Sequence, residues 1–208
     1  VVGAPAVLGG VGAARRSWEE EEEEELAATQ SMGPSHADFY PTVSLRALTR
    51  IVRDATLVTY HGQVIAAIGA ILTSLGAKCV PYLPPVMPLL LTAASRGGEA
   101  PLREAAVHQL AVLVGIIQQH VRAYVPSLLA LAKEHLRNST QPSRIQIDCI
   151  ALVEQLGIAL NDEFRDHLPR LMPQLLAILH ADRSERRLAS HRVLHALDTF
   201  GQNLQPRL

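Results

Sequence analysis

A proline-rich phrase recurs along this 208-residue chain at an almost constant interval. The two clearest copies are YLPPVMPLLL at 82–91 and LPRLMPQLL at 168–176, and weaker copies begin at Tyr40 and Tyr124. The first prolines of the four copies stand 43, 42 and 43 residues apart: Pro41, Pro84, Pro126 and Pro169. A fixed period in the forties is typical of solenoids built from pairs of helices. The period therefore predicts an all-α fold, an α-solenoid of about four repeats.

The composition agrees with helix-on-helix packing. Hydrophobic residues make up 48% of the chain and aromatic residues only 4%, so Leu, Ala, Val and Ile must fill the core. Such side chains interdigitate well between helices, whereas a sandwich or barrel would contain more aromatic and β-branched residues. The net charge is −1. Because there is no clustered basic stripe, we expect no nucleic-acid partner.

Residues 1–37 differ from the rest, and we expect a disordered segment or linker there. Its glutamates at 19–25 repel one another and favour a solvated chain. An apolar run leads into Gly10 and Gly12, as in a dinucleotide-binding turn, but Arg15 stands where close helix packing needs glycine or alanine. Without a starting Met or a basic region this run does not resemble a signal peptide, and we expect the sequence to start inside a longer protein.

Hydrophobic periodicity from Asp38 onward predicts four helix pairs within a repeat array over 38–204. The expected helices are 40–54 with 61–75, 81–95 with 101–119, 121–137 with 143–160, and 163–180 with 184–200. The expected repeats are 38–76, 80–119, 121–160 and 162–201, and a truncated next repeat would begin at 205–208. No uninterrupted apolar run reaches the roughly 18 residues that a membrane helix requires, so we expect no membrane span.

Several residues predict how these helices end and bend. Gly76 suits a left-handed cap, Ser143 an N-cap, and Asp182 or Ser184 the start of the last helix. Pro88 lies one turn inside its helix, where the missing amide should bend it. The last helix is expected to bury an apolar stripe: Leu188, Val193, Leu194, Leu197 and Phe200.

We predict no catalytic, cofactor-binding or metal-binding residue in this chain. His191 and His195 are four residues apart, as paired metal ligands can be, but no glutamate follows the first and several arginines lie nearby. A solvated basic ridge is the preferred interpretation, and a contact patch for an acidic peptide is the alternative.

Other polar and sulfur-containing residues have structural interpretations. A carboxylate cluster is expected to favour the start of the helix 163–180 through its charge: Asp162, Glu163 and Asp166. Met87 and Met172 are expected to fill the core. Cys79 and Cys149 are expected to be buried, reduced thiols of an intracellular protein.

The period, the bent first helix and the phrase LREAA at 102–106 resemble HEAT repeats of the armadillo-type helical superhelix. A more specific resemblance covers about residues 39–204 and excludes 1–37. Its phrases are YPTV at 40–43, ALTRIVRD at 47–54, SLGAKCV at 74–80 leading into LPPVMP at 83–88, then LP at 168–169, MP at 172–173 and FGQNL at 200–204. In this order they resemble the N-terminal HEAT region of the target-of-rapamycin (TOR) kinases. Asn161 stands where that family has glycine.

The resemblance implies a segment of a non-specific serine/threonine protein kinase that controls growth in response to nutrients. It implies ATP and Mg²⁺ for a kinase domain outside these residues, and a HEAT scaffold that binds a raptor-like regulatory subunit and the TOR dimer mate. It also implies a cytoplasmic protein with endomembrane and nuclear pools. The alternative is a free-standing HEAT adaptor of the transport-receptor or phosphatase-scaffold type, which the downstream reading frame would distinguish.

Overall fold

The computed structural model describes residues 32–95, 99–137 and 143–203. Within these ranges the regular structure is entirely helical, which confirms the predicted all-α repeat fold. The chain divides into two compact units, Val1–Arg46 and Ala47–Leu208. The first unit contributes a turn at 32–38 and the beginning of α2 (Phe39–Arg53). The predicted linker at 1–37 lies mostly outside the described residues, as does the predicted further repeat at 205–208.

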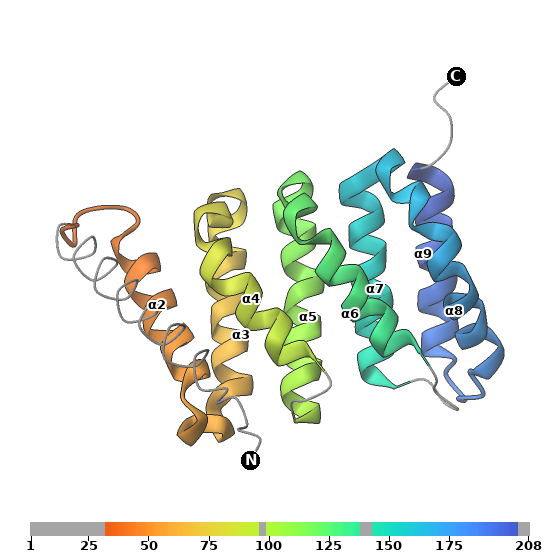
Figure 1. Cartoon of the computed structure of the whole chain (residues 1–208), viewed down its shortest axis with the longest axis horizontal. Helices are drawn as coiled ribbons and strands as arrows, with labels where there is room; N and C mark the ends of the chain where they lie inside the picture. Colours follow the sequence, from red (N-terminus) through yellow and green to blue (C-terminus); the bar gives the residue numbers. More distant parts are fainter. Residues whose placement is uncertain (1–31, 96–98, 138–142, 204–208) are drawn as a thin grey trace, which may run out of the picture. The chain divides into compact units, whose positions relative to one another are not determined.

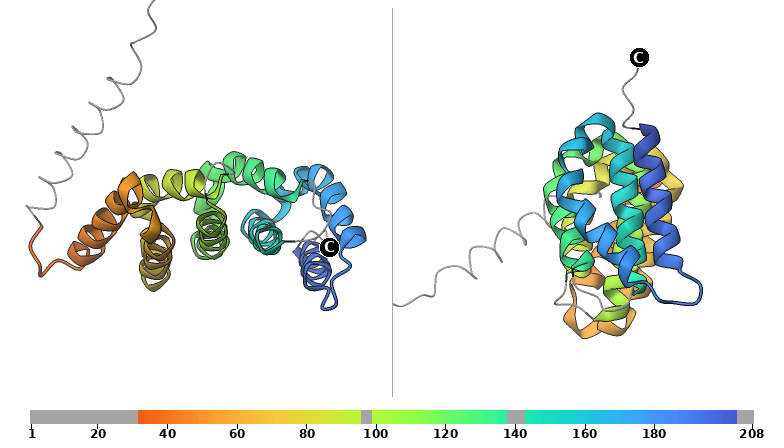
Figure 2. Two further views of the ribbon diagram at one scale, coloured as in Figure 1. Left: turned by 90° about the horizontal axis from the view of Figure 1, so that it is seen from below. Right: turned by 90° about the vertical axis from the view of Figure 1, so that its right-hand side faces the viewer.

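The second unit is a two-layer array of helices. One row contains the helices α3 (Val58–Leu75), α5 (Ala100–Ile117), α7 (Arg144–Leu160) and α9 (Leu188–Asn203). The other row contains α4 (Leu83–Ala94), α6 (Val125–Leu136) and α8 (Leu168–Ala181), as the end-on view in Figure 2 shows. In the first row α3 packs on α5, α5 on α7 and α7 on α9, and the helices α5, α7 and α9 also pack on α4, α6 and α8 (Figure 1). These bounds agree with the predicted helices to within about five residues.

The recurrent prolines occupy one helical position. Pro84, Pro126 and Pro169 are each the second residue of a helix, in α4, α6 and α8. There the missing amide removes no intrahelical hydrogen bond. Pro88 and Pro173 lie deeper in α4 and α8, where each does remove one. That Pro88 bends its helix stays a prediction.

Short 3-10 helices replace the turn expected inside the first pair and the loops expected between successive pairs. They are η1 (Ala55–Leu57), η2 (Gly76–Tyr82), η3 (Gln118–Tyr124) and η4 (Asn161–Asp166). The last three each open on a residue with positive φ that ends the preceding α-helix: Gly76 (φ 55°, ψ −134°), Gln118 (48°, −124°) and Asn161 (48°, −123°). These values match the first central position of a type II′ turn. The left-handed cap predicted at Gly76 is therefore right about the sign of φ and wrong about ψ.

Glycines allow close approach between successive helices of the first row. A β-carbon added at Gly69 in α3 would overlap the Gln109 side chain of α5, and one at Gly115 in α5 would lie 2.8 Å from Gln155 Oε1 of α7. At Gly157 in α7 it would lie 2.6 Å from Phe200 of α9. A residue with a side chain cannot occupy these positions without moving its neighbour.

The core lies between the two rows, and most predicted core residues lie in it. Met87 is fully buried, whereas Met172 is only partly buried. The prediction that both methionines fill the core is therefore right for Met87 and only partly right for Met172. The stripe predicted on α9 is wrong at Leu188 and Leu194, which are 56% and 58% exposed. The small residues Ala189 and Ala196 are buried instead, beside Val193 and Phe200.

Both cysteines are buried free thiols, as predicted. Burial raises the pKa of Cys149 to about 12, with a further contribution from the charge of Asp148. Burial also raises the pKa of Cys79.

Two stretches of successive helices, Ala55–Ala94 and Ala100–Leu136, are long and apolar enough to cross a membrane by length and composition alone. Each is interrupted by a 3-10 helix rather than being one continuous α-helix. Many of their apolar side chains are buried within the array, among them Ile65, Ile68 and Leu110. Helix packing accounts for the buried part of their hydropathy, and the absence of a membrane span stays a prediction.

Candidate functional site

A buried carboxylate ties α7 to α9. Glu154 is only 3% exposed. Its Oε2 lies 2.8 Å from Arg192 Nη2 and its Oε1 lies 2.8 Å from His195 Nδ1, both on α9. The hydroxyl of Thr199 donates a hydrogen bond to the same Oε1 at 3.3 Å. Oε2 accepts no hydrogen bond, although Arg192 Nη2 is only 2.8 Å away. The Arg192 contact is therefore an ion pair without hydrogen-bond alignment.

The three α9 residues share one helix face because they are three and four positions apart. The sequence predicted a solvated basic ridge here, which agrees with the exposed side chains of His191 and His195 and is wrong for Arg192. Arg192 is half-buried, and the side chains of Arg192 and His195 are directed to the carboxylate of Glu154. His191 is exposed and is not brought onto this carboxylate. The two histidines therefore do not form a shared ligand set.

A second carboxylate joins α5 to α7. Asp148 Oδ1 lies 3.2 Å from His108 Nδ1 of α5, and Asp148 Oδ2 lies 3.7 Å from Arg144 Nε one turn earlier in α7. The Asp148 side chain is largely buried, whereas the His108 side chain is half exposed.

A third pair joins η3 to η4 on the surface. Arg122 binds Glu163 through two hydrogen bonds, Nε to Oε2 at 3.1 Å and Nη2 to Oε1 at 2.8 Å. Hydrogen bonding to the guanidinium lowers the pKa of Glu163, and the same contact raises the pKa of Arg122. Asp162 lies 3.6 Å from Arg165 within η4.

The sequence predicted Asp162 and Glu163 at the start of an α-helix. They lie in the 3-10 helix η4 instead. The difference arises because α8 begins only at Leu168, after η4 has ended at Asp166.

A buried histidine joins two successive helices of the second row. His135 of α6 donates from Nε2 to the carbonyl oxygen of Ala94, at the end of α4, at 2.7 Å. Gln146 of α7 donates to the carbonyl oxygen of His135 at 3.4 Å. These bonds satisfy polar groups that would otherwise be costly to bury between helices.

These polar contacts have a common sequence separation. The residue pairs His108–Asp148, Arg122–Glu163, Ala94–His135 and Glu154–Thr199 are 40, 41, 41 and 45 residues apart. Each pair thus joins one repeat to the next at nearly equivalent positions. Hydrogen-bonded charges fix the register of helix faces that apolar contacts alone would leave free to slide.

The helix starts that hold these residues are themselves hydrogen-bonded. Ser143 is the N-cap of α7, as predicted, and its amide donates to Gln146 Oε1 at 3.1 Å. Asp182, before α9, is fully buried and accepts hydrogen bonds from the amide and hydroxyl of both Ser184 and Ser190. These bonds, the one from the Ser184 hydroxyl above all, hold the pKa of Asp182 well below its ordinary value. The prediction that Asp182 caps the last helix is confirmed.

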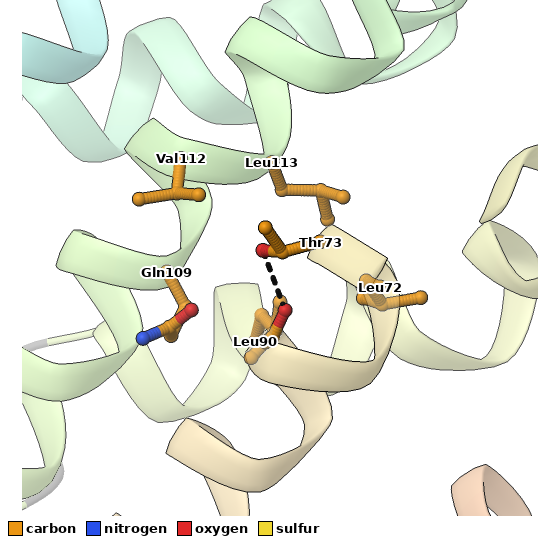
Figure 3. A pocket seen from close by; sticks show the side chains of 7 residues that line it. Leu72, Thr73, Leu90, Gln109, Val112 and Leu113 are labelled. Carbon is orange, nitrogen blue, oxygen red and sulfur yellow. Dashed lines mark hydrogen bonds between the residues drawn. The ribbon is translucent and has the colours of Figure 1, made fainter. Parts of the chain in front are cut away.

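Two hollows of the array differ in size. Seven residues of α3, α4 and α5 line the first, in which Thr73, Leu90, Gln109 and Leu113 close on one another and leave no room for a water molecule (Figure 3). The second is an open surface depression of about 440 Å³ between the end of α7 and the segments η3 and η4. Its polar lining includes the Arg122–Glu163 pair, whose charges already satisfy each other.

The polar side chains described above join helices of neighbouring repeats. Among the described residues, no group of three or more His, Cys, Asp or Glu side chains is placed to hold a metal ion. The carboxylates of Glu154, Asp148 and Glu163 are each occupied by a cation or histidine from the neighbouring element. That the chain has no catalytic residue stays a prediction.

Sequence reasoning missed Glu154, Asp148, His108 and Arg122 as contact residues. A signal existed, because each lies about one repeat away from a polar partner. The repeat register has to be known before that spacing becomes informative.

Comparison with known proteins identifies the family. The family model described as "Serine/threonine-protein kinase mTOR domain" matches residues 9–118. The match begins well before residue 39, so the sequence-based exclusion of 1–37 from the resemblance is wrong for residues 9–37.

Curated relatives match most of the chain. A serine/threonine-protein kinase mTor of Drosophila melanogaster is 42% identical over 174 residues, or 84% of this chain. A serine/threonine-protein kinase TOR of Arabidopsis thaliana is 38% identical over 82% of the chain, and TOR2 of Saccharomyces cerevisiae is 31% identical over 85%. The chain spans about 7% of the length of each of these relatives. It therefore corresponds to a segment of such kinases, and the chain belongs to the TOR family of serine/threonine-protein kinases.

Proposed function

We propose that this chain is the scaffold segment of a TOR-type serine/threonine protein kinase that acts in nutrient and growth signalling. Its helix pairs are HEAT repeats, and they present helical faces to a raptor-like regulatory subunit and to the TOR dimer mate. Phosphoryl transfer with ATP and Mg²⁺ belongs to another part of the kinase. The proposed location is the cytoplasm, with endomembrane and nuclear pools.

The observation that supports this role is the set of polar contacts between successive repeats. Contacts such as Glu154–Arg192 and Arg122–Glu163 use charged groups to hold one helix pair against the next. Groups engaged in this way are not available to a substrate, but they keep the outer helix faces in a fixed register. A fixed array of helix faces is what a broad protein-binding surface requires.

The proposal can be tested in the full-length kinase with one charged substitution on each row of helices. Val112 of α5 is 37% exposed and Leu176 of α8 is 43% exposed, so Val112→Asp and Leu176→Asp alter the surface and leave the core intact. We expect at least one variant to lower recovery of the regulatory subunit or of the dimer, while turnover of a short peptide substrate is kept. Unchanged assembly in both variants would contradict the scaffold role. Phosphoryl transfer by the 208-residue chain alone would also contradict it.

A further inference from the structure

The turn between α8 and α9 presents three arginines to solvent. Arg183, Arg186 and Arg187 are all exposed. None of their side chains forms an ion pair or a hydrogen bond with any residue in the described part of the chain. Two carboxylates adjoin the arginines in the sequence, Glu185 within the turn and the buried Asp182 directly before it, so three cations against two anions leave residues 182–187 net positive. This turn, residues 183–187, is called the arginine turn below, and it connects the two blue helices at the end of the array (Figure 1).

The arginine turn is held by the buried carboxylate that precedes it. Asp182 accepts hydrogen bonds from the amide and hydroxyl of Ser184 at 3.0 and 2.6 Å, and from the amide and hydroxyl of Ser190 at 2.9 Å each. These bonds fix both ends of the turn. The amide of Arg187 also donates to the carbonyl oxygen of Ser184 at 3.2 Å. A partner therefore meets cationic groups on a backbone that is already ordered, so binding costs little further backbone entropy.

An apolar side chain adjoins the charges. Leu188 follows the arginine turn directly and is 56% exposed. Apolar contact beside arginines suits a peptide that carries both carboxylates and an aliphatic residue. A nucleic acid would instead need a longer basic stripe and stacking aromatic side chains, and the turn has neither.

We propose that the arginine turn is a docking site for an acidic segment of a partner protein. The segment's carboxylates pair with Arg183, Arg186 and Arg187, and an aliphatic side chain packs on Leu188. Arginine suits this role because its planar guanidinium can bind a carboxylate through two hydrogen bonds.

The test titrates the 208-residue chain with a fluorescent peptide of Glu and Asp around one Leu, measured by anisotropy. The Arg183→Gln/Arg186→Gln variant is compared with Arg137→Gln/Arg170→Gln, which removes the same net charge from exposed arginines elsewhere. We expect the first variant to raise Kd by about two- to thirtyfold, from two surface ion pairs of roughly 0.2–1 kcal/mol each. The matched control should change Kd little. Affinity should also fall as salt rises to about 0.15 M.

Equal weakening in the two double variants would overturn the proposal, because it would show attraction by net charge alone. Two further probes separate the other classes of polyanion. A labelled single-stranded oligonucleotide and vesicles of phosphatidylcholine with phosphatidylserine should bind more weakly than the peptide. Stronger binding of either one would assign the arginine turn to that class instead. Replacing the central Leu of the peptide by Ser should weaken binding, and no effect would reject the Leu188 contact.

Discussion

The positive-φ corner at the end of α3 gives a sharp test of how this chain turns from one repeat to the next. Gly76 has φ 55° and ψ −134°, and a β-carbon built there meets no heavy atom within 4 Å. Gly76→Ala therefore introduces backbone strain and no steric clash with other residues. A side chain at positive φ costs about 1–3 kcal/mol. The stiffer unfolded chain recovers roughly 0.4–1 kcal/mol of this cost. The expected loss in the free energy of unfolding is about 1–2 kcal/mol.

Gly62, within α3, provides the matched control. A β-carbon there also meets no heavy atom within 4 Å, but the residue lies inside a regular helix. Gly62→Ala should therefore raise the free energy of unfolding by about 0.5–1 kcal/mol. The positive-φ corner at the end of α7 allows the opposite substitution, because Asn161 already bears a side chain at φ 48°. Asn161→Gly should raise the free energy of unfolding by up to about 1 kcal/mol.

Urea unfolding followed by circular dichroism at constant pH measures these differences. With a slope of about 2 kcal/mol per molar urea, the midpoints of Gly76→Ala and Gly62→Ala should differ by roughly 1 M. The sign is the decisive result. If Gly76→Ala raises the midpoint as Gly62→Ala does, the strain assigned to the corner does not exist.

The other predictions concern single contacts described above. Glu154→Gln weakens the contacts with Arg192 and His195. Because both partners are partly exposed, we expect the free energy of unfolding in urea to fall by about 1–2 kcal/mol. An unchanged value would show that the packing of α7 on α9 needs no charge between them. The pKa of Asp182 is lower in the folded chain than in the unfolded chain, so its stabilising contribution is complete above the unfolded pKa of about 4 and is lost as pH falls toward the folded value. Acid titration should therefore show a shallower loss of stability below about pH 4 in Asp182→Asn than in the parent chain, and parallel curves would refute the assignment. Gly157→Ala should cost about 1–3 kcal/mol because its β-carbon would meet Phe200 at 2.6 Å, whereas Gly201→Ala meets nothing within 4 Å and should be neutral or stabilising. Cys149, with its pKa raised to about 12, should react with a thiol reagent at pH 8 only after unfolding, and rapid labelling of the folded chain would contradict its burial.

The elements that the sequence predicted well are those with a direct local signal. Proline can start a helix without losing a hydrogen bond, so Pro84, Pro126 and Pro169 indicated where α4, α6 and α8 lie, although the predicted starts at 81, 121 and 163 came before the observed starts at Leu83, Val125 and Leu168. Gly76 likewise marked the end of α3. Gln118 ends α5 with the same backbone geometry, yet glutamine carries no signal for positive φ. The corner at Gln118 was therefore unpredictable from residue type, whereas Gly76 and Asn161 are residue types that tolerate positive φ.

Side-chain direction was harder to predict than helix position. Hydrophobicity favoured Leu188 and Leu194 as buried residues of α9, but both are largely exposed. Ala189 and Ala196 are buried instead. The face of α9 that meets α7 carries Phe200, which lies against Gly157, and also Arg192 and His195, whose side chains contact the buried Glu154. A buried charge on a neighbouring helix cannot be inferred from the periodicity of one helix alone.

The contacts between repeats also determine how the array responds to force. His108–Asp148 and Arg122–Glu163 each join a repeat to its immediate neighbour. Under tension along the array, the interfaces therefore carry the load in series, and their small extensions add as in a chain of springs. A partner protein that binds across two neighbouring repeats would place a second link in parallel with the interface between them. Binding would then stiffen the array at that point and leave its other interfaces free to extend.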